Sequence, residues 1–332
     1  MSYDCNLLLT TSNPNGGGNS IKDKRNLLID FQRAILITLV ILVHVVHFGK
    51  IHPNIKESIL TFMMPSFLVI TGYLVNINKP LKKFLLYILK IALPYTIMVM
   101  GYMILSLYLP VQDGIKSFDV NTVCNVLFVT SIGPYWFFRI MIICGICYYL
   151  IFHNRLSFLN LQAKYILLGS AFLAISLFTP IMTAKCAFYY FIGVGIRLYV
   201  KDFRKICVGT FWAFIPLMIM LSQKEWRDWA TIYVIASVFC FFSISTQLAT
   251  YPKGKFKNCL LYIGRNTLPI YIFHPIFTML AKFALPAFQF DSTGCLHAVF
   301  TIVLGFVGSL GIAWCMDKTR LSYIFGYKKI LR

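Results

Sequence analysis

The sequence predicts an all-α fold, a polytopic integral membrane helix bundle of about ten spans with both termini in the cytoplasm. Three observations lead to this prediction. Of the 332 residues, 58% are hydrophobic and 13% are charged, a composition typical of polytopic membrane proteins. Long apolar windows recur along the chain, with Lys and Arg between them. The number of Lys and Arg residues alternates between high and low from one connection to the next, as the positive-inside rule requires.

Ten apolar windows reach, or nearly reach, the length needed to cross a bilayer core. A helix needs about 20 apolar residues for this, and the window at 187–200 is the shortest. We expect residues 109–134 to form a long outer connection. Within it, residues 123–129 are expected to lie in the membrane interface or to dip into the membrane. The ten windows are 30–48, 59–77, 84–108, 135–153, 165–182, 187–200, 206–222, 229–249, 260–281 and 296–316.

The distribution of positive charge orients this bundle. With the N-terminus inside, the cytoplasmic segments carry twenty Lys and Arg residues and the outer segments carry seven. Because positive loops stay on the cytoplasmic side, the net charge of +20 indicates topology, and no nucleic-acid binding is expected. The inner cations are Lys22, Lys24, Arg25, Lys79, Lys82, Lys83, Arg155, Lys164, Arg197, Lys201, Arg204, Lys205, Lys253, Lys255, Lys257, Lys318, Arg320, Lys328, Lys329 and Arg332, and the outer ones are Lys50, Lys56, Lys116, Lys185, Lys224, Arg227 and Lys282.

This topology divides the chain into three parts. We expect a flexible cytoplasmic tail at residues 1–25, a ten-span domain at 26–316 and a basic cytoplasmic tail at 317–332. Ten cysteines are scattered along the chain. Cys144 and Cys147 form a Cys-x-x-Cys without a second pair nearby, so they are expected to fill apolar space, and no metal site is predicted.

The first window carries a stripe of ionisable side chains. Ten residues separate Arg33 from His44, which places them about 20° apart around a helix and about 16 Å apart along it. His47 falls about 40° from Arg33 on the same side. Ionisable residues inside a membrane helix are costly and usually functional. The alternative for His44 is a neutral imidazole bonded to a neighbouring span.

Three further cations, Lys90, Arg139 and Arg265, fall inside apolar windows, whereas no Asp or Glu falls deep in any of them. Ion-coupled transporters commonly place an acidic residue at the midplane. The pattern therefore favours an anionic ligand, such as phosphate, that enters from the cytoplasmic side. In the alternative, Lys90 extends its ammonium to the interface, and the two arginines bind helix carbonyls.

His274 lies between Pro269 and Pro275. Proline frees backbone carbonyls within a helix. His274 is therefore expected either to take part in the site or simply to satisfy one of these carbonyls.

Four segments resemble motifs of membrane acyltransferase family 3, which includes the O-acetyltransferases of bacterial surface polysaccharides. The likeness covers almost all of residues 25–316. The spacing of Arg33 and His44 matches the first-span motif. Thr71 and Thr267 stand where Ser is usual, and Lys90 stands where the third span often has Arg, which weakens bidentate phosphate binding there. The other segments are 64–74, similar to Pro-x-Phe…Ser-Gly-Tyr-Leu, 134–139, similar to Leu-Trp-Phe-Leu in the version with an Arg, and 263–274, similar to Gly-x-Asn-Ser-x-x-Ile-Tyr-Leu-x-His.

The resemblance implies an integral-membrane O-acyltransferase of the bacterial cytoplasmic (inner) membrane, in contact with membrane lipid. Such an enzyme moves an acyl group, usually acetyl from acetyl-CoA, to a hydroxyl of a cell-surface polysaccharide or its lipid-linked precursor. His44 is expected to act as general base or to carry the acyl group transiently. Arg33 is expected to hold the CoA phosphates or pantetheine, with Lys90 and Arg265 as helpers. Supporting roles are expected for His47, Tyr73, Arg139 and His274.

Two other functions fit part of the pattern. A transporter or flippase for an anionic lipid-linked sugar explains the inner cations equally well, but it does not explain the motif segments. A polysaccharide polymerase would be expected to carry its chemistry in large outer loops, and the longest outer loop here has few charged residues. Thioester turnover by the purified protein distinguishes these alternatives.

Overall fold

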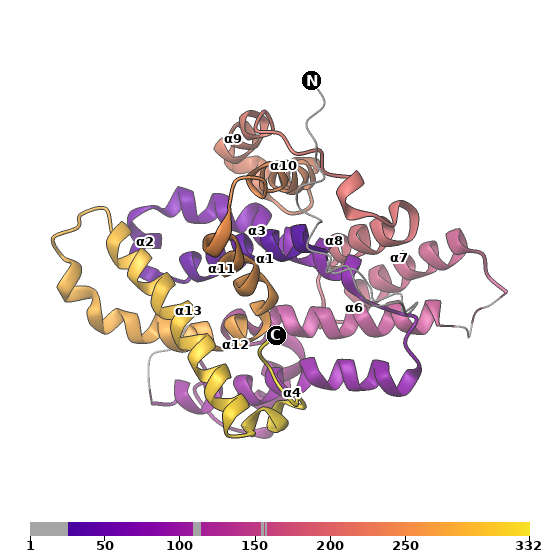
Figure 1. Ribbon diagram of the computed structural model, residues 1–332. Helices are drawn as coiled ribbons and strands as arrows, with labels where there is room; N and C mark the ends of the chain where they lie inside the picture. The colour runs from indigo at the N-terminus through magenta and orange to yellow at the C-terminus, as the bar shows by residue number, and fades with distance from the viewer. Residues whose placement is uncertain (1–25, 109–113, 154–155, 157) are drawn as a thin grey trace, which may run out of the picture.

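The computed structural model of the protein describes residues 26–108, 114–153, 156 and 158–332. Every regular element in these ranges is a helix, so the expected all-α membrane bundle is confirmed. Figure 1 shows long helices, such as α4 and α6, running side by side. The expected tail at residues 1–25 lies outside the described part. In chain order the elements are α1 (Leu27–Val43), α2 (Val46–Ile51), α3 (Pro53–Leu74), α4 (Leu81–Ser106), α5 (Val120–Asn125), η2 (Val126–Thr130), η3 (Gly133–Tyr135), α6 (Trp136–Phe152), α7 (Leu161–Phe178), α8 (Ala184–Gly195), η4 (Ile196–Val200), η5 (Phe203–Lys205), α9 (Phe214–Ser222), η6 (Lys224–Arg227), α10 (Ile232–Leu248), α11 (Gly254–Arg265), α12 (Thr267–Leu280), η7 (Ala281–Phe288), α13 (Cys295–Lys318) and η8 (Leu321–Phe325).

Among the described residues, 6 helices are long and apolar enough to cross a membrane: α3, α4, α6 with η3, α7, α12 with η7, and α13. The other windows hold shorter helices. α1 and α10 have 17 residues each, α8 has 12 and α9 has 9, the last about 14 Å long or half a bilayer core. The chain is therefore a multi-pass membrane protein, and the count of ten spans stays a prediction.

The window at 260–281 is not one continuous helix, contrary to the expectation. α11 ends at Arg265 and α12 begins at Thr267. The physical reason is Pro269, which has no N–H and whose ring excludes a helical carbonyl at residue 265. The break at Asn266 gives α12 its own start beside α1.

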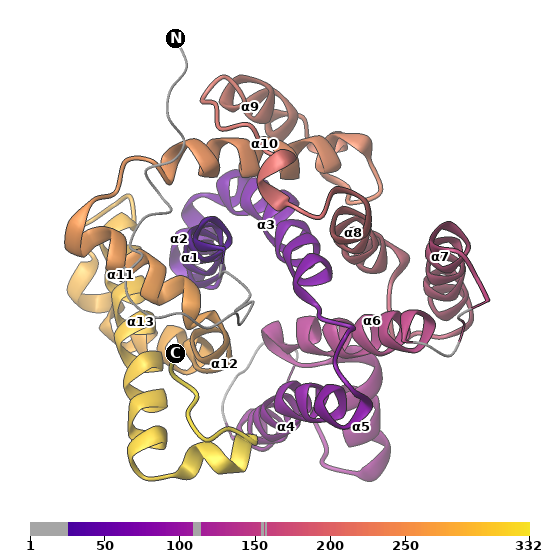
Figure 2. The ribbon, with the colours of Figure 1, turned by 45° about the vertical axis from the view of Figure 1, so that its right-hand side comes forward.

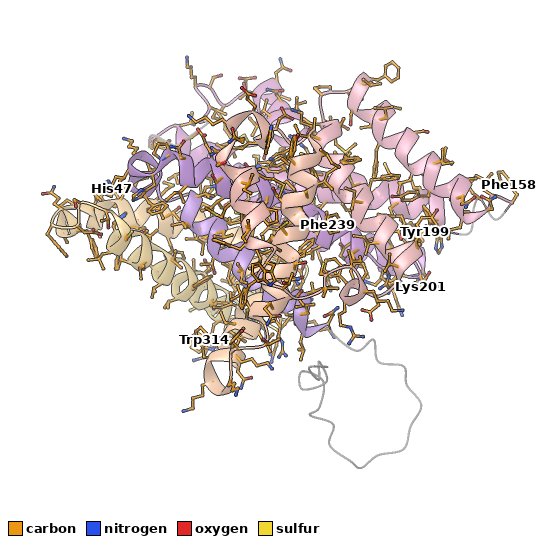
Figure 3. The ribbon with its side chains drawn as sticks, turned by 90° about the horizontal axis from the view of Figure 1, so that it is seen from above. His47, Phe158, Tyr199, Lys201, Phe239 and Trp314 are labelled. Carbon is orange, nitrogen blue, oxygen red and sulfur yellow. The ribbon has the colours of Figure 1, made fainter. Side chains whose placement is uncertain are left out.

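The molecule has two opposite ends. Figure 3 shows His47 at one end and Phe158, Tyr199 and Lys201 at the other. The charge-based topology expects His47 close to the outer surface, and the other three close to the cytoplasmic surface. The arrangement agrees with the predicted order of connections, and the assignment of one end to the cytoplasm stays a prediction.

Helix α1 lies inside the bundle. Figure 2 shows α3, α10, α11, α12 and α13 around it, and Leu36 and Ile37 are fully buried. α11 approaches α1 so closely at Gly264 that a Cβ there would lie 1.7 Å from the Asp30 carbonyl oxygen. Only glycine fits this contact without a shift of the backbone. The contact holds the end of α11, and therefore the start of α12, against α1.

The segment after α13, expected as a basic tail, folds back onto the bundle. The Asn266 side chain accepts the backbone N–H of Arg332 at 2.8 Å and donates to its carbonyl at 3.2 Å. Asp317 accepts two backbone N–H groups of the same segment. The segment 319–332 is therefore part of the ordered structure next to the start of α12.

The connection before α6 packs in part against the bundle, and whether 123–129 lies in the membrane interface or dips inward stays a prediction. α5 continues into the π-helical turn η2, and Ser131 then takes a φ of 68°, in the left-handed region. The Leu127 carbonyl accepts the hydroxyl of Tyr95 from α4 at 2.6 Å. Val126 and Ile132 are buried, so this connection contributes to the interior of the bundle.

Candidate functional site

Two side-chain pairs join α1 to α12. Arg33 Nη2 donates to Thr267 Oγ1, and the rings of His44 and His274 meet edge to face with their centroids 5.2 Å apart. Thr267 and His274 are seven positions apart, so they share a face of α12. The structure therefore brings the first and the last motif segments together, with an arginine and a hydroxyl at one level and two imidazoles at another.

The position of His44 at the end of α1 determines which ring nitrogen is free. α1 ends at Val43, and the backbone N–H of His44 bonds to the Ile41 carbonyl. The Val40 carbonyl would accept the His44 backbone N–H in a continued helix. Here it accepts a hydrogen bond from the His44 ring nitrogen Nδ1 instead, at 2.7 Å. Since a carbonyl can only accept, Nδ1 carries the proton and Nε2 presents a lone pair. Nε2 has no hydrogen-bond partner within the described ranges, and the residue is partly buried.

His274 repeats this arrangement on α12. It is fully buried, and its Nδ1 lies 3.1 Å from the Ile270 carbonyl and 3.0 Å from the Tyr271 carbonyl. Pro275 has no N–H with which to bond Tyr271, four positions earlier. Of the two alternatives for His274, the contact with the Tyr271 carbonyl shows that it does satisfy a carbonyl freed by proline, and its role in a site stays a prediction. Its Nε2 is buried without a partner in the described part of the chain.

Arg33 belongs to a cationic region beside α4. The charges of Arg33 and Arg332 both act on the hydroxyl of Tyr87. The Lys90 ammonium lies 5.1 Å from the centre of the Tyr327 ring, and the Tyr327 hydroxyl donates to the Lys90 carbonyl at 3.1 Å. Lys90 thus contacts Tyr327, and Arg33 and Arg332 both have backbone or side-chain hydrogen bonds at the start of α12. An anionic ligand suits such a region, and Arg33 has further interactions besides its bond to Thr267.

Arg265 has an acidic partner, contrary to the expectation that the membrane cations lack one. Its Nε lies 3.7 Å from Asp30 Oδ2, and the Asp30 side chain is 5% exposed. The sequence places Asp30 at the edge of its window, but the close contact of α11 at Gly264 buries it. An ion pair within the protein therefore already offsets the charge of Arg265.

His47 does not continue the stripe of Arg33 and His44. α1 ends at Val43, Val45 is extended (φ −76°, ψ 97°), and His47 belongs to the separate helix α2. The expectation of one continuous helical face is therefore wrong at this residue. His47 lies against the His297 ring, with centroids 5.8 Å apart, and lines a cavity of about 250 Å³.

Tyr73 lies away from both pairs and has structural partners. Its hydroxyl donates to the Lys201 carbonyl at 2.9 Å and accepts the Phe203 N–H at 3.3 Å. The guanidinium of Arg197 lies over its ring, 5.5 Å from the centroid. Tyr73 therefore anchors the connection after η4.

Arg139 is also separate from the histidine pair. It lies on α6, where Tyr95 of α4 and Cys186 of α8 act on its charge. The expected bonds from Arg139 to helix carbonyls are not found within the described ranges.

Sequence reasoning missed several parts of this site. Asp30, His297 and the tyrosines of the cationic region were not identified, because single Asp, His and Tyr residues carry no distinctive spacing. Thr267 was noted for its hydroxyl, and its position seven residues before His274 could have placed it on the face toward α1. The Val40 carbonyl is available because α1 ends, and the Tyr271 carbonyl is available because residue 275 is proline. Only the proline can be seen in the sequence.

The comparisons with known proteins give one match. A family model of acyltransferase family 3, described as an acyltransferase domain, matches residues 26–317. Neither a curated protein nor a solved structure matches the chain.

Proposed function

The chain belongs to membrane acyltransferase family 3, and on this premise we propose that it moves an acetyl group from acetyl-CoA to a sugar hydroxyl. We place it in the bacterial cytoplasmic membrane, with a surface polysaccharide or its lipid-linked precursor as acceptor. Membrane acyltransferase activity follows from the family. The donor, the acceptor and the roles of individual residues are the proposal, which the geometry of α1 and α12 supports.

The observation that carries the proposal is the free Nε2 of His44. Nδ1 is occupied by the Val40 carbonyl, so only Nε2 can accept a proton. A sugar hydroxyl is a poor nucleophile, and transfer of its proton to a positioned base promotes its attack. The hydroxyl oxygen bonds to the thioester carbonyl carbon while its proton passes to Nε2. The C–S bond then breaks, and the CoA sulfur leaves with that proton.

His274 supports this step as a positioning residue. Its ring meets the His44 ring edge to face, and its two carbonyl contacts hold its own orientation. A second positive charge 5 Å away would oppose protonation of His44. A neutral His274 therefore orients His44 and leaves it able to accept the proton.

The donor is proposed to enter from the end where α1 begins. Arg33 and Arg332 act on Tyr87 there and Lys90 contacts Tyr327, and the phosphates of CoA match such a set of cations. Arg265 is held by Asp30, but its side chain is 38% exposed, so it can assist at the edge. From this end the thioester of an extended pantetheine arm would point along α1 toward His44.

The test is acetyl transfer by the purified protein, with labelled acetyl-CoA and a candidate glycan. His44→Ala should lower the rate by roughly 10²–10⁴-fold, as loss of a general base does, while CoA binding persists. His47→Ala is the matched control and should retain clear activity, because it lies on another helix. An inactive His47→Ala with an active His44→Ala would reverse the assignment.

The same preparation tests the alternative. A protein that moves lipid-linked sugar across vesicles but never turns over the thioester would be a flippase. That result, or full activity in both histidine variants, would refute the proposed mechanism.

A further inference from the structure

Arg139 is a partly buried cation whose charge no acidic group offsets in the described part of the chain. Its Nε and Nη1 atoms are buried and have no hydrogen-bond partner there. No described Asp or Glu lies within ion-pair distance of it. The groups that act on its charge are Tyr95 and Cys186. Burial of an unpaired charge is costly, so an anionic partner from outside the chain would stabilise the two buried nitrogens of Arg139.

Other cations of the bundle have a hydroxyl, a carboxylate or an aromatic ring as partner within the protein, whereas no described acidic group pairs with Arg139. Arg33 bonds to Thr267, Arg265 pairs with Asp30, and Lys90 lies over the Tyr327 ring. At the outer surface, Lys185 pairs with Asp228 at 2.6 Å. The fold therefore provides partners for these cations, and it leaves Arg139 without an acidic partner and able to bind an anion.

Further polar groups gather beside Arg139. The Tyr95 hydroxyl lies near both Ser131 and Arg139. Ser131 is 7% exposed, and its Oγ has no hydrogen-bond partner within the described ranges. Its positive φ of 68° is a conformation that non-glycine residues seldom adopt and that persists only where the surroundings impose it. The π-helical turn η2 directly precedes it, and such turns are frequent at functional sites.

Aromatic contacts link the first turn of α6, which carries Arg139, to His274 of the histidine pair. Phe138 precedes Arg139 on α6, and its ring meets the Tyr271 ring at 5.1 Å. Tyr271 in turn lies 5.7 Å from the His274 ring, and its hydroxyl donates to the Pro134 carbonyl at 2.5 Å. The first turn of α6 is therefore packed directly on the part of α12 that carries His274. A molecule that reacts at His44 could extend to Arg139.

We propose that Arg139 and Ser131 bind an oxyanion, a phosphate or carboxylate, carried by the acyl acceptor, while the Tyr95 hydroxyl stays bonded to the Leu127 carbonyl beside them. A guanidinium forms strong, often paired hydrogen bonds with such groups, and the Ser131 hydroxyl, which has no partner in the described structure, supplies a further donor. The acceptor is then an acidic sugar or a sugar phosphate, and a neutral glycan is a poor substrate. The identification of the bound molecule as the acyl acceptor rests on the proposed function. The anion site itself does not depend on acyl transfer.

Binding is tested first, without acetyl-CoA. Radiolabelled glucose 1-phosphate is titrated against the protein in maltoside micelles that contain no phospholipid. Arg139→Gln should weaken binding by about 10- to 100-fold and Ser131→Ala by about 3- to 10-fold, while Arg139→Lys should give an intermediate value. Lys185→Gln removes a cation that already has a partner, and it should leave binding unchanged. Glucose 1-phosphate binding that is equal in all four variants would overturn the proposal.

The source of the oxyanion is tested by competition, because a lipid headgroup carries the same phosphate chemistry. Phosphatidylglycerol is added to the micelles at the concentration of glucose 1-phosphate. The proposal expects little displacement. If phosphatidylglycerol displaces all of the glucose 1-phosphate from the unsubstituted protein at this ratio, and displaces none from Arg139→Gln, the site binds lipid instead.

Acyl transfer is then compared between glucuronate and glucose. Arg139→Gln should raise the KM for glucuronate by at least tenfold and leave the KM for glucose and for acetyl-CoA unchanged. An equal loss for both sugars would contradict the acceptor role. If no sugar is acylated but glucose 1-phosphate binding depends on Arg139, the proposed function fails while the anion site stands.

Discussion

At the residue scale, two histidines obtain the same tautomer from two different defects in helical hydrogen bonding. His44 uses the Val40 carbonyl, which the end of α1 leaves without its helical N–H partner. His274 uses the Tyr271 carbonyl, which Pro275 cannot reach with an N–H. Each contact occupies Nδ1 and leaves Nε2 free. The backbone thus fixes the same ring nitrogen of both imidazoles and leaves the other without a partner in the described structure.

The prediction at this scale concerns Arg33. Arg33→Ala should raise the acetyl-CoA concentration required for half-maximal transfer by roughly one to two orders of magnitude, because a charged hydrogen bond contributes roughly 1.5–3 kcal/mol. Steady-state kinetics with varied acetyl-CoA measure this. Arg204→Ala is the matched control, since Arg204 pairs with Asp202 on the surface at 2.8 Å. An unchanged requirement in Arg33→Ala would remove Arg33 from the donor site.

At the scale of elements, the relation of α1 to α11 and α12 depends on one glycine. Gly264 brings α11 against the Asp30 backbone, buries the Asp30 carboxylate beside Arg265, and sets the start of α12. The pair of Arg33 and Thr267 follows from that start. A small residue therefore controls the distance between the two helices that carry the site.

We expect Gly264→Ala to destabilise the protein by roughly 1–3 kcal/mol, the usual cost of overpacking a tight interior, and to weaken acetyl-CoA binding. Thermal unfolding in detergent measures the first effect. Gly101→Ala provides the control, because a Cβ at Gly101 meets no atom within 4 Å and alanine favours a helix. Equal unfolding temperatures in the two variants would contradict the proposed role of the contact.

At the scale of the whole molecule, positive charge and helix arrangement lead to one topology. The segments expected in the cytoplasm carry most of the Lys and Arg residues. Phe158, Tyr199 and Lys201, from two of these segments, lie at the end opposite His47 (Figure 3). Helices shorter than a bilayer core, such as the 9-residue α9, make the count of spans depend on packing.

The topology prediction is that reporter fusions after Lys83, Lys205, Lys257 and Arg332 all report the cytoplasm. The positive-inside rule is the reason. Paired alkaline phosphatase and fluorescent-protein fusions provide the measurement, with a fusion after Lys116 as the outer control. A periplasmic signal at any of the four positions would refute the ten-span arrangement.

The sequence by itself determined the helical class and the positions of most membrane segments, and it singled out Arg33 and His44 as candidate site residues. These depend on hydropathy, proline and spacing, all of which are local properties of the chain. The same properties offered the carbonyl contact of His274 as one of two alternatives for that residue.

Only the tertiary structure decided which of the candidate residues meet. Arg33 bonds to a residue 234 positions away, Asp30 is buried by a helix from the other end of the chain, and His47 leaves the stripe because α1 ends one residue before His44. Arg139 is distinguished only by partners that are missing from its surroundings in the described structure. Helix ends, ion pairs and unsatisfied charges depend on contacts between distant segments, and no local pattern encodes them.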